Sequence, residues 1–139
     1  VNSRKEDIVK VLEEERDAGH PIDVAIDCLG GSIQGKCLQY MRYGGRWIMI
    51  ATLAGDITEV DLKKLYVLNV RLIGSTLRSK KPEFKAKLLA TLVKDVWPKI
   101  DTGEVRPTIY KVLPITEAEA AHAILERGEN VGKVVLKVR

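Results

Sequence analysis

Short apolar runs separated by amphipathic segments dominate the pattern along this chain. The apolar runs predict strands and the amphipathic segments predict helices, because strands and helices bury side chains at different spacings. The predicted strands cover residues 23–29, 46–53, 71–76, 108–113 and 133–138. The predicted helices cover residues 5–18, 32–42, 60–69, 82–97 and 117–127.

The order of these elements predicts an α/β fold. The first three strands are apolar throughout and alternate with helices, which is typical of a parallel sheet covered on both faces. The last two strands alternate polar and apolar residues, so we expect them to be half-exposed and to belong to a different sheet.

Local residue chemistry predicts where several helices begin and end. Gly19 and Gly128 are placed to end helices, and Ser32 and Thr116 to cap them. Pro98 is expected to stop the helix that begins near Pro82. We expect that helix to bury one apolar face, made of Phe84, Leu88, Leu89, Leu92, Val93 and Val96.

Composition excludes several classes of protein. The chain has 139 residues and a net charge of +4, spread along it without long charge runs, which argues for one domain and against nucleic-acid binding. No apolar stretch approaches the ~20 residues of a membrane helix, and the charged start resembles no signal peptide. Two cysteines make neither a zinc pattern nor a disulfide framework. We therefore expect a cytoplasmic protein without a metal, although the absent initiating Met indicates a fragment or a processed product.

One motif points toward nucleotide hydrolysis. The segment GGSIQGKC, residues 30–37, matches the P-loop pattern except at its last position, where Cys37 replaces the Ser or Thr that binds Mg²⁺. A cysteine is a poor ligand for so hard a cation. A glycine turn leading into a helix with Lys36 in solvent is the preferred interpretation, and the P-loop is kept as a rival.

The predicted topology points to a second kind of site. Ligands of open α/β sheets bind at the carboxyl ends of the strands, here residues 27–31, 50–53 and 75–77. These ends are rich in small residues, which let the backbone approach a flat ligand closely. The G-x-G-x-x-G fingerprint of dinucleotide sites is absent, however, so the residues alone establish a plausible site without a ligand.

Three polar residues could each have either a structural or a functional role. Cys28 ends an apolar strand, where a thiol usually packs without reacting. Asp27 is either a buried acid or a cap for the following turn, and we favour the cap. His122 lies among alanines with no carboxylate placed to orient it, so we expect a structural histidine and name no catalytic residue.

Four segments together resemble the C-terminal part of the medium-chain dehydrogenase/reductase superfamily. They are most similar to the zinc-free quinone oxidoreductases, the ζ-crystallin-like branch. The segments are DVAIDCLGG (23–31), GGRWIMIATLAG (44–55), RLIGSTLRS (71–79) and PITEAEAAHAILERGENVGKVVLKV (114–138). The resemblance covers essentially the whole chain.

The resemblance implies a partial fold. Residues 1–103 would form the second half of a Rossmann domain, a doubly wound parallel sheet that binds NAD(P). Residues 104–139 would be a C-terminal α+β segment of the GroES-like catalytic domain. Longer family members carry that domain and the glycine-rich loop ahead of this region. The parent would transfer hydride from NADPH, or from NADH, to a quinone or an activated alkene, whereas this chain alone is expected to be inactive.

The resemblance also assigns cofactor-binding residues, but no catalytic residue and no zinc ligand. Ser3 stands where the family has Tyr or His beside the adenosine 2′-phosphate, a departure that Arg4 and Lys5 could offset with charge. Backbone groups near the third strand end would meet the nicotinamide amide, and the strand itself would lie near a homodimer contact. The implied cofactor-binding set is Ser3, Gly31, Ile50, Ala51, Thr52, Gly74, Ser75, Thr76 and Asn130.

Two alternatives remain beside the quinone oxidoreductase and the P-loop. The chain could be part of an enoyl reductase module in a larger synthase. It could also be a non-catalytic interaction domain that keeps the half-Rossmann sheet for dimerisation.

Overall fold

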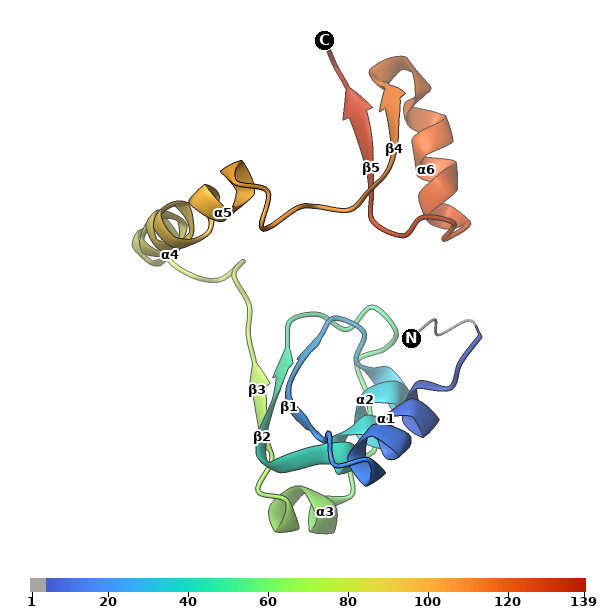
Figure 1. The fold of residues 1–139 in the computed structure, drawn as a ribbon, viewed down its shortest axis with the longest axis vertical. Coiled ribbons are helices and arrows are strands. Elements are labelled where there is room, and N and C mark those ends of the chain that lie inside the picture. The colour runs from blue at the N-terminus through green and yellow to red at the C-terminus, as the bar shows by residue number, and fades with distance from the viewer. Residues whose placement is uncertain (1–4) are drawn as a thin grey trace. The chain divides into compact units, whose positions relative to one another are not determined.

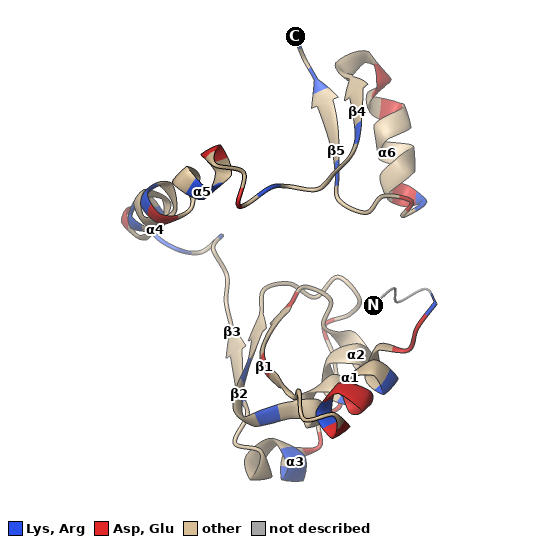
Figure 2. Cartoon of the chain, viewed as in Figure 1, with Lys and Arg blue, Asp and Glu red and all other residues tan. Residues whose placement is uncertain are grey.

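The computed structural model describes residues 5–139 and divides the chain into two compact units, residues 1–80 (unit 1) and 81–139 (unit 2) (Figure 1). Each unit is described by itself. Acidic and basic residues occur together on α1 (Ile8–Asp17) in unit 1 and on α4 (Pro82–Asp95) in unit 2 (Figure 2). The expected division into residues 1–103 and 104–139 concerns the complete family fold and stays a prediction.

Unit 1 is a three-stranded parallel sheet with helices on one face. The strand order is β1-β2-β3, so the predicted parallel α/β arrangement is confirmed. Its elements are α1 (Ile8–Asp17), β1 (Ile22–Asp27), α2 (Gly31–Cys37), a 3₁₀ turn (Leu38–Tyr40), β2 (Met41–Met49), α3 (Leu62–Val67) and β3 (Arg71–Gly74).

The second strand starts earlier than predicted. Gly44 and Gly45 were expected to precede it, but they lie inside β2. The pairing jumps from Ile22–Met41 to Val24–Arg46, so β2 holds an irregularity that accommodates the extra residues. Gly44 takes a φ of +74°, which a glycine adopts at little steric expense. The glycine pair therefore bends this strand and does not end it.

The core of unit 1 lies between the sheet and its helices. The buried residues are Cys37, Leu38, Met41, Trp47 and Val70, and apolar side chains of α1 and α3 pack against them. Val24, Ile26 and Ile73 are exposed, and Val24 and Ile26 share one face of β1 because side chains alternate along a strand. Within unit 1 this face of the sheet is uncovered, so the expected cover on both faces is not observed. The face also carries Arg46 and Arg71, which are paired in register with Val24.

Unit 2 contains a second parallel pair of strands. As predicted, β4 and β5 form a sheet separate from that of unit 1, and Leu113, Ala121 and Ile124 are buried between it and α6. The elements of unit 2 are α4 (Pro82–Asp95), α5 (Trp97–Asp101), β4 (Ile109–Pro114), a 3₁₀ turn (Ile115–Glu117), α6 (Ala118–Glu126) and β5 (Lys133–Lys137).

The predicted boundaries of two helices, α2 and α6, are wrong. The helix α2 begins at Gly31 without a side-chain cap and ends at Cys37, because a 3₁₀ turn leads directly into β2. Thr116 lies inside a 3₁₀ turn and does not cap α6. The helix α4 ends at Asp95, before Pro98, as predicted. Pro98 also lies in the first turn of a further helix, α5, where its missing N–H leaves no bond unmade.

The expected burial of the α4 apolar face is also not observed. Phe84, Leu88, Leu89, Leu92 and Val93 are all exposed on that helix. The periodicity correctly predicts an amphipathic helix, and α4 packs mainly against α5 within unit 2.

Candidate functional site

The loops that follow β1 and β2 are joined at the carboxyl edge of the sheet. Three backbone hydrogen bonds connect them, so the sheet pairing continues beyond the strands themselves. The bonds run from Leu53 N to Cys28 O (3.1 Å), from Ala54 N to Leu29 O (2.7 Å) and from Gly31 N to Gly55 O (2.9 Å).

Two glycines make this close approach possible. Gly30 and Gly31 have φ angles of +61° and +59°, in the left-handed region that other residues rarely adopt. A Cβ atom on Gly30 would lie 2.8 Å from the carbonyl oxygen of Gly55, and one on Gly31 equally close to that of Ala54. The predicted glycine turn is therefore also the place where the two loops pack together.

Asp27 lies beneath this turn and is 9 % exposed. Its Oδ1 accepts hydrogen bonds from the backbone N–H groups of Leu29 (2.8 Å) and Gly30 (3.0 Å). Its Oδ2 accepts one from the indole Nε1 of Trp47 on β2, at 3.0 Å. The favoured interpretation of Asp27 as a turn cap is confirmed. Its bond to Trp47 was missed because the two residues are far apart in sequence, although a buried indole N–H usually has a partner.

The third strand ends at the same edge. The backbone N–H of Ser75 donates to the carbonyl oxygen of Met49 at 2.8 Å, which ties the end of β3 to that of β2. A Cβ atom on Gly74 would meet nothing within 4 Å, so the backbone is open to approach there. Ile50 is 52 % exposed at the end of β2, and Thr52 donates from its hydroxyl to Asp56 at 2.5 Å.

The structure thus brings most of the expected cofactor-binding residues to one edge. Gly31, residues 50–52 and residues 74–76 follow the three adjacent strands of unit 1. Asn130 belongs to unit 2, where its side-chain Nδ2 donates to the carbonyl oxygen of Gly132 at 2.7 Å. Ser3 lies outside the described residues. The cofactor-binding role of the whole set stays a prediction.

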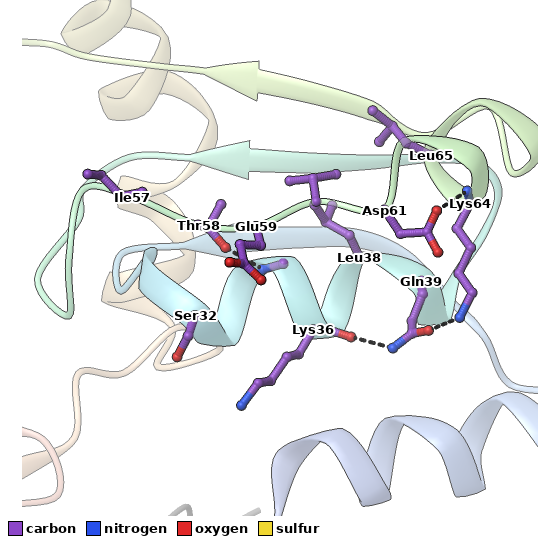
Figure 3. Close-up of a pocket in the computed structure, with 12 residues that line it drawn as sticks. Ser32, Lys36, Leu38, Gln39, Ile57, Thr58, Glu59, Asp61, Lys64 and Leu65 are labelled. Atoms are coloured by element: carbon purple, nitrogen blue, oxygen red, sulfur yellow. Dashed lines mark hydrogen bonds between the residues drawn. The ribbon is translucent and has the colours of Figure 1, made fainter.

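A groove of about 770 Å³ lies along α2, between that helix and residues 57–65 (Figure 3). Gly35 packs against the backbone of Glu59, and its N–H donates to the hydroxyl of Thr58 at 3.0 Å. Lys64 donates to the side chain of Gln39, and the Gln39 amide donates to the carbonyl oxygen of Lys36. Polar groups that pair with one another therefore line part of the groove, and the apolar side chains of Leu38, Ile57, Val60 and Leu65 line another part.

The P-loop alternative is wrong. Residues 31–37 form the helix α2, so they cannot wrap a phosphate as a loop does. Lys36 is exposed to solvent, in line with the preferred interpretation, and Gly35 packs against residues 58–59.

The two cysteines differ in environment. Cys28 is exposed, so its expected role as packing is wrong. Cys37 is buried, and burial raises the pKa of its thiol, helped by the negative charge of Asp27. His122 is exposed on α6, so it is not a buried structural histidine.

No metal centre or membrane segment occurs in the part of the chain that the structure describes. Within residues 5–139, no three His, Cys, Asp or Glu side chains come together so that they could hold one ion. No helix over the same residues is long and apolar enough to cross a membrane.

Comparisons with known proteins agree with the fold. A family model described as zinc-binding dehydrogenase matches residues 1–136. The NAD-dependent alcohol dehydrogenase of Sulfolobus acidocaldarius is 28 % identical over 133 residues, which is 93 % of this chain and 36 % of that protein. Highly-reducing polyketide synthase 1 of Aureobasidium melanogenum is 30 % identical over 125 residues, 85 % of this chain and 5 % of the synthase.

Among solved structures, the quinone oxidoreductase of Thermus thermophilus, also described in its complex with NADPH, is 26 % identical. It superposes with a TM-score of 0.72 and covers 91 % of this chain. This chain matches only 40 % of that structure, so it spans less than half of these relatives.

Proposed function

The chain belongs to the zinc-binding dehydrogenase family of medium-chain dehydrogenases/reductases, and from this we propose that it forms half of a nicotinamide-binding domain. The complete protein would be an NADPH-dependent oxidoreductase that transfers hydride to a quinone or an activated alkene. Because the chain spans about a third of its dehydrogenase relative, the reaction is assigned to the complete protein.

The carboxyl edge of the three-stranded sheet carries this proposal. Ligands of parallel α/β sheets bind there, and backbone hydrogen bonds hold the loops after β1 and β2 together at this edge. The open backbone at Gly74 and the exposed side chain of Ile50 fit a flat cofactor lying against this edge. The reduced nicotinamide supplies the hydride when bound, and the chain supplies contacts that orient it.

Each segment of the edge has its own task in the proposal. Gly31 would lie on the adenosine side, residues 50–52 would line the middle, and the backbone of residues 74–76 would hold the nicotinamide amide. Asn130 would close the site in the complete protein. NADPH is proposed as the cofactor because of the resemblance to the family. Ser3 departs from the family's Tyr or His beside the adenosine 2′-phosphate, and Arg4 and Lys5 would offset that departure with positive charge.

Despite the family's name, no step of this proposal passes through zinc. Within residues 5–139 no donor set fits a zinc site, and the proposed assignment to the zinc-free quinone oxidoreductase branch rests on the resemblance of the four sequence segments to that branch. The proposed cytoplasmic location, and the proposed lack of nucleic-acid or membrane partners, rest on composition alone.

A homodimer is also proposed, through the outer edge of β3. All four residues of β3 are exposed, and a parallel strand at an edge presents unpaired backbone groups to a second copy. Mass measurements over a range of protein concentrations would test this, and a monomer at high concentration would contradict it. Dimerisation without any response to nucleotide would favour the non-catalytic alternative.

An enoyl reductase module is the second candidate function. The similarity to a highly-reducing polyketide synthase favours it, because the same region occurs there within a much larger protein. Assays of the complete protein with a quinone and with an enoyl thioester, following the absorbance of the reduced nicotinamide, would separate the two functions.

The direct test of the site is a titration of this chain with NADPH and with NADH, followed by NMR of the backbone amides. We expect shifts at Gly31, residues 50–52 and residues 74–76. We expect an affinity weaker than micromolar, because the sequence holds no glycine-rich loop to bind the pyrophosphate. Shifts confined to other residues, or none at saturating cofactor, would contradict the proposed function.

A further inference from the structure

We propose that Asp27 is a positioning residue of the nicotinamide site, and that it acts by linking the β1 turn to Trp47 on β2. The inference rests on the proposed function and deepens it. Asp27 is not among the residues expected to contact the cofactor, because its carboxylate lies beneath the turn and is turned toward the protein.

The carboxylate is buried among N–H donors. One oxygen accepts from the two backbone N–H groups of Leu29 and Gly30, and the other accepts from the indole of Trp47, which is itself 7 % exposed. Hydrogen bonds to an ionised acceptor are stronger than neutral ones, and a buried charge is tolerated only when it is paired in this way. Asp27 therefore fixes the turn relative to β2.

The turn after β1 also holds the loop that follows β2. Leu29 donates its N–H to Asp27 and accepts at its carbonyl from Ala54, and Gly30 lies in a parallel bridge with Gly55. A displacement of the turn would therefore move residues 53–55, which directly follow the segment expected to line the cofactor. Asp27 determines the spacing between the two loops without contacting a ligand.

Replacement of Asp27 by asparagine creates a specific conflict. The asparagine amide offers one oxygen and one NH₂ group to a site that holds N–H donors on both sides. Whichever way the amide is oriented, an N–H group faces another N–H group. The change Trp47→Phe removes the indole donor, so the double variant Asp27→Asn with Trp47→Phe removes the conflict. The two changes would add if the Asp27 and Trp47 side chains did not interact, whereas a shared hydrogen bond makes their effects couple.

The test is NADPH binding by the full 139-residue chain, measured by NMR shifts of the edge amides and alongside urea unfolding. We expect Asp27→Asn to weaken NADPH binding about tenfold, the size of one lost charge-assisted hydrogen bond. The double variant should bind to within about threefold of Trp47→Phe alone, and better than Asp27→Asn. The matched control is Asp23→Asn, since that carboxylate lies on the same strand but is exposed and pairs with Arg42.

The results separate the two proposals. If the wild type binds and Asp27→Asn binds equally well, the positioning role is overturned while the proposed function stands. Additive losses in the double variant would also overturn it. If the wild type shows no edge shifts with saturating NADPH or NADH, the proposed function fails and this inference falls with it. If Asp27→Asn does not fold, NADPH binding by Trp47→Phe becomes the test of the positioning role. An affinity of Trp47→Phe for NADPH equal to that of the wild type would overturn the role.

Discussion

Replacing Gly35 by alanine sets two effects of opposite sign against each other. Gly35 lies inside α2, and alanine in a helix interior is favoured over glycine by about 1 kcal/mol. The added Cβ, however, would overlap the backbone carbonyl of Glu59 and lie 2.6 Å from the Thr58 hydroxyl. Because the carbonyl belongs to the backbone, no side-chain rotation relieves the overlap.

The overlap should outweigh the gain in helix propensity. Overpacking costs about 1–3 kcal/mol. An outward shift of residues 57–61 would also break the hydrogen bond from Gly35 N to Thr58, worth about 1 kcal/mol. We expect Gly35→Ala to lower the free energy of unfolding by roughly 1–3 kcal/mol, which moves the urea midpoint down by about 1 M.

Tryptophan fluorescence can follow the unfolding of unit 1 alone. Trp47 is buried in unit 1 and Trp97 lies in unit 2, so the change Trp97→Phe leaves Trp47 as the reporter. The matched control is Gly74→Ala, where the added Cβ enters open space, and its midpoint should stay close to the parent. A Gly35→Ala midpoint at or above the parent value would refute the packing of residues 57–61 on α2.

Three further predictions concern a cap, the thiols and an ion pair. Asp7 begins α1 by accepting a hydrogen bond from Val9 N at 2.9 Å, so Asp7→Ala should lower the unfolding free energy by about 1 kcal/mol. Asp7→Ser should keep most of it in the same urea measurement, and equal losses in both variants would contradict the cap. Cys28 should react with a thiol reagent at neutral pH and Cys37 only after urea is added, since burial blocks Cys37 and raises the pKa of its thiol. Two fast thiols in the native chain would mean that α2 is not packed as described. The hydrogen bond from Arg127 lowers the pKa of Glu129, so an NMR titration should place that pKa below the ordinary glutamate value, and Arg127→Gln should return it. Because the folded pKa is the lower one, the pair stabilises the fold above the ordinary glutamate pKa and loses this effect as the pH falls through the lowered value; identical titrations would exclude the interaction.

Elements whose signals are local could be predicted well from the residues. The helix α1 falls within its predicted range and ends next to Gly19, because the apolar periodicity and the glycine point to the same end. The turn cap made by Asp27 is also local, since its backbone partners are only two and three residues away. The parallel sheet followed from the alternation of apolar runs with amphipathic segments.

Elements fixed by distant contacts could not be predicted. The bond from Trp47 to Asp27, the fit of residues 54–55 against Gly30 and Gly31, and the contact of Gly35 with Glu59 all join separate segments. The early start of β2 has the same origin, because pairing with Ile22 extends the strand through a glycine pair that looks like a break. The exposure of Cys28 was missed because an apolar neighbourhood in sequence does not ensure burial.

The division of the chain into two contiguous units bears on the order in which the protein folds during synthesis. Every strand of the first sheet precedes Lys81, and both strands of the second follow it. A ribosome makes the amino end first, and domains generally fold as they emerge, at about 5–20 residues per second of elongation. The three strands that carry the proposed cofactor-binding edge are therefore synthesised while α4, β4 and β5 are still to be translated.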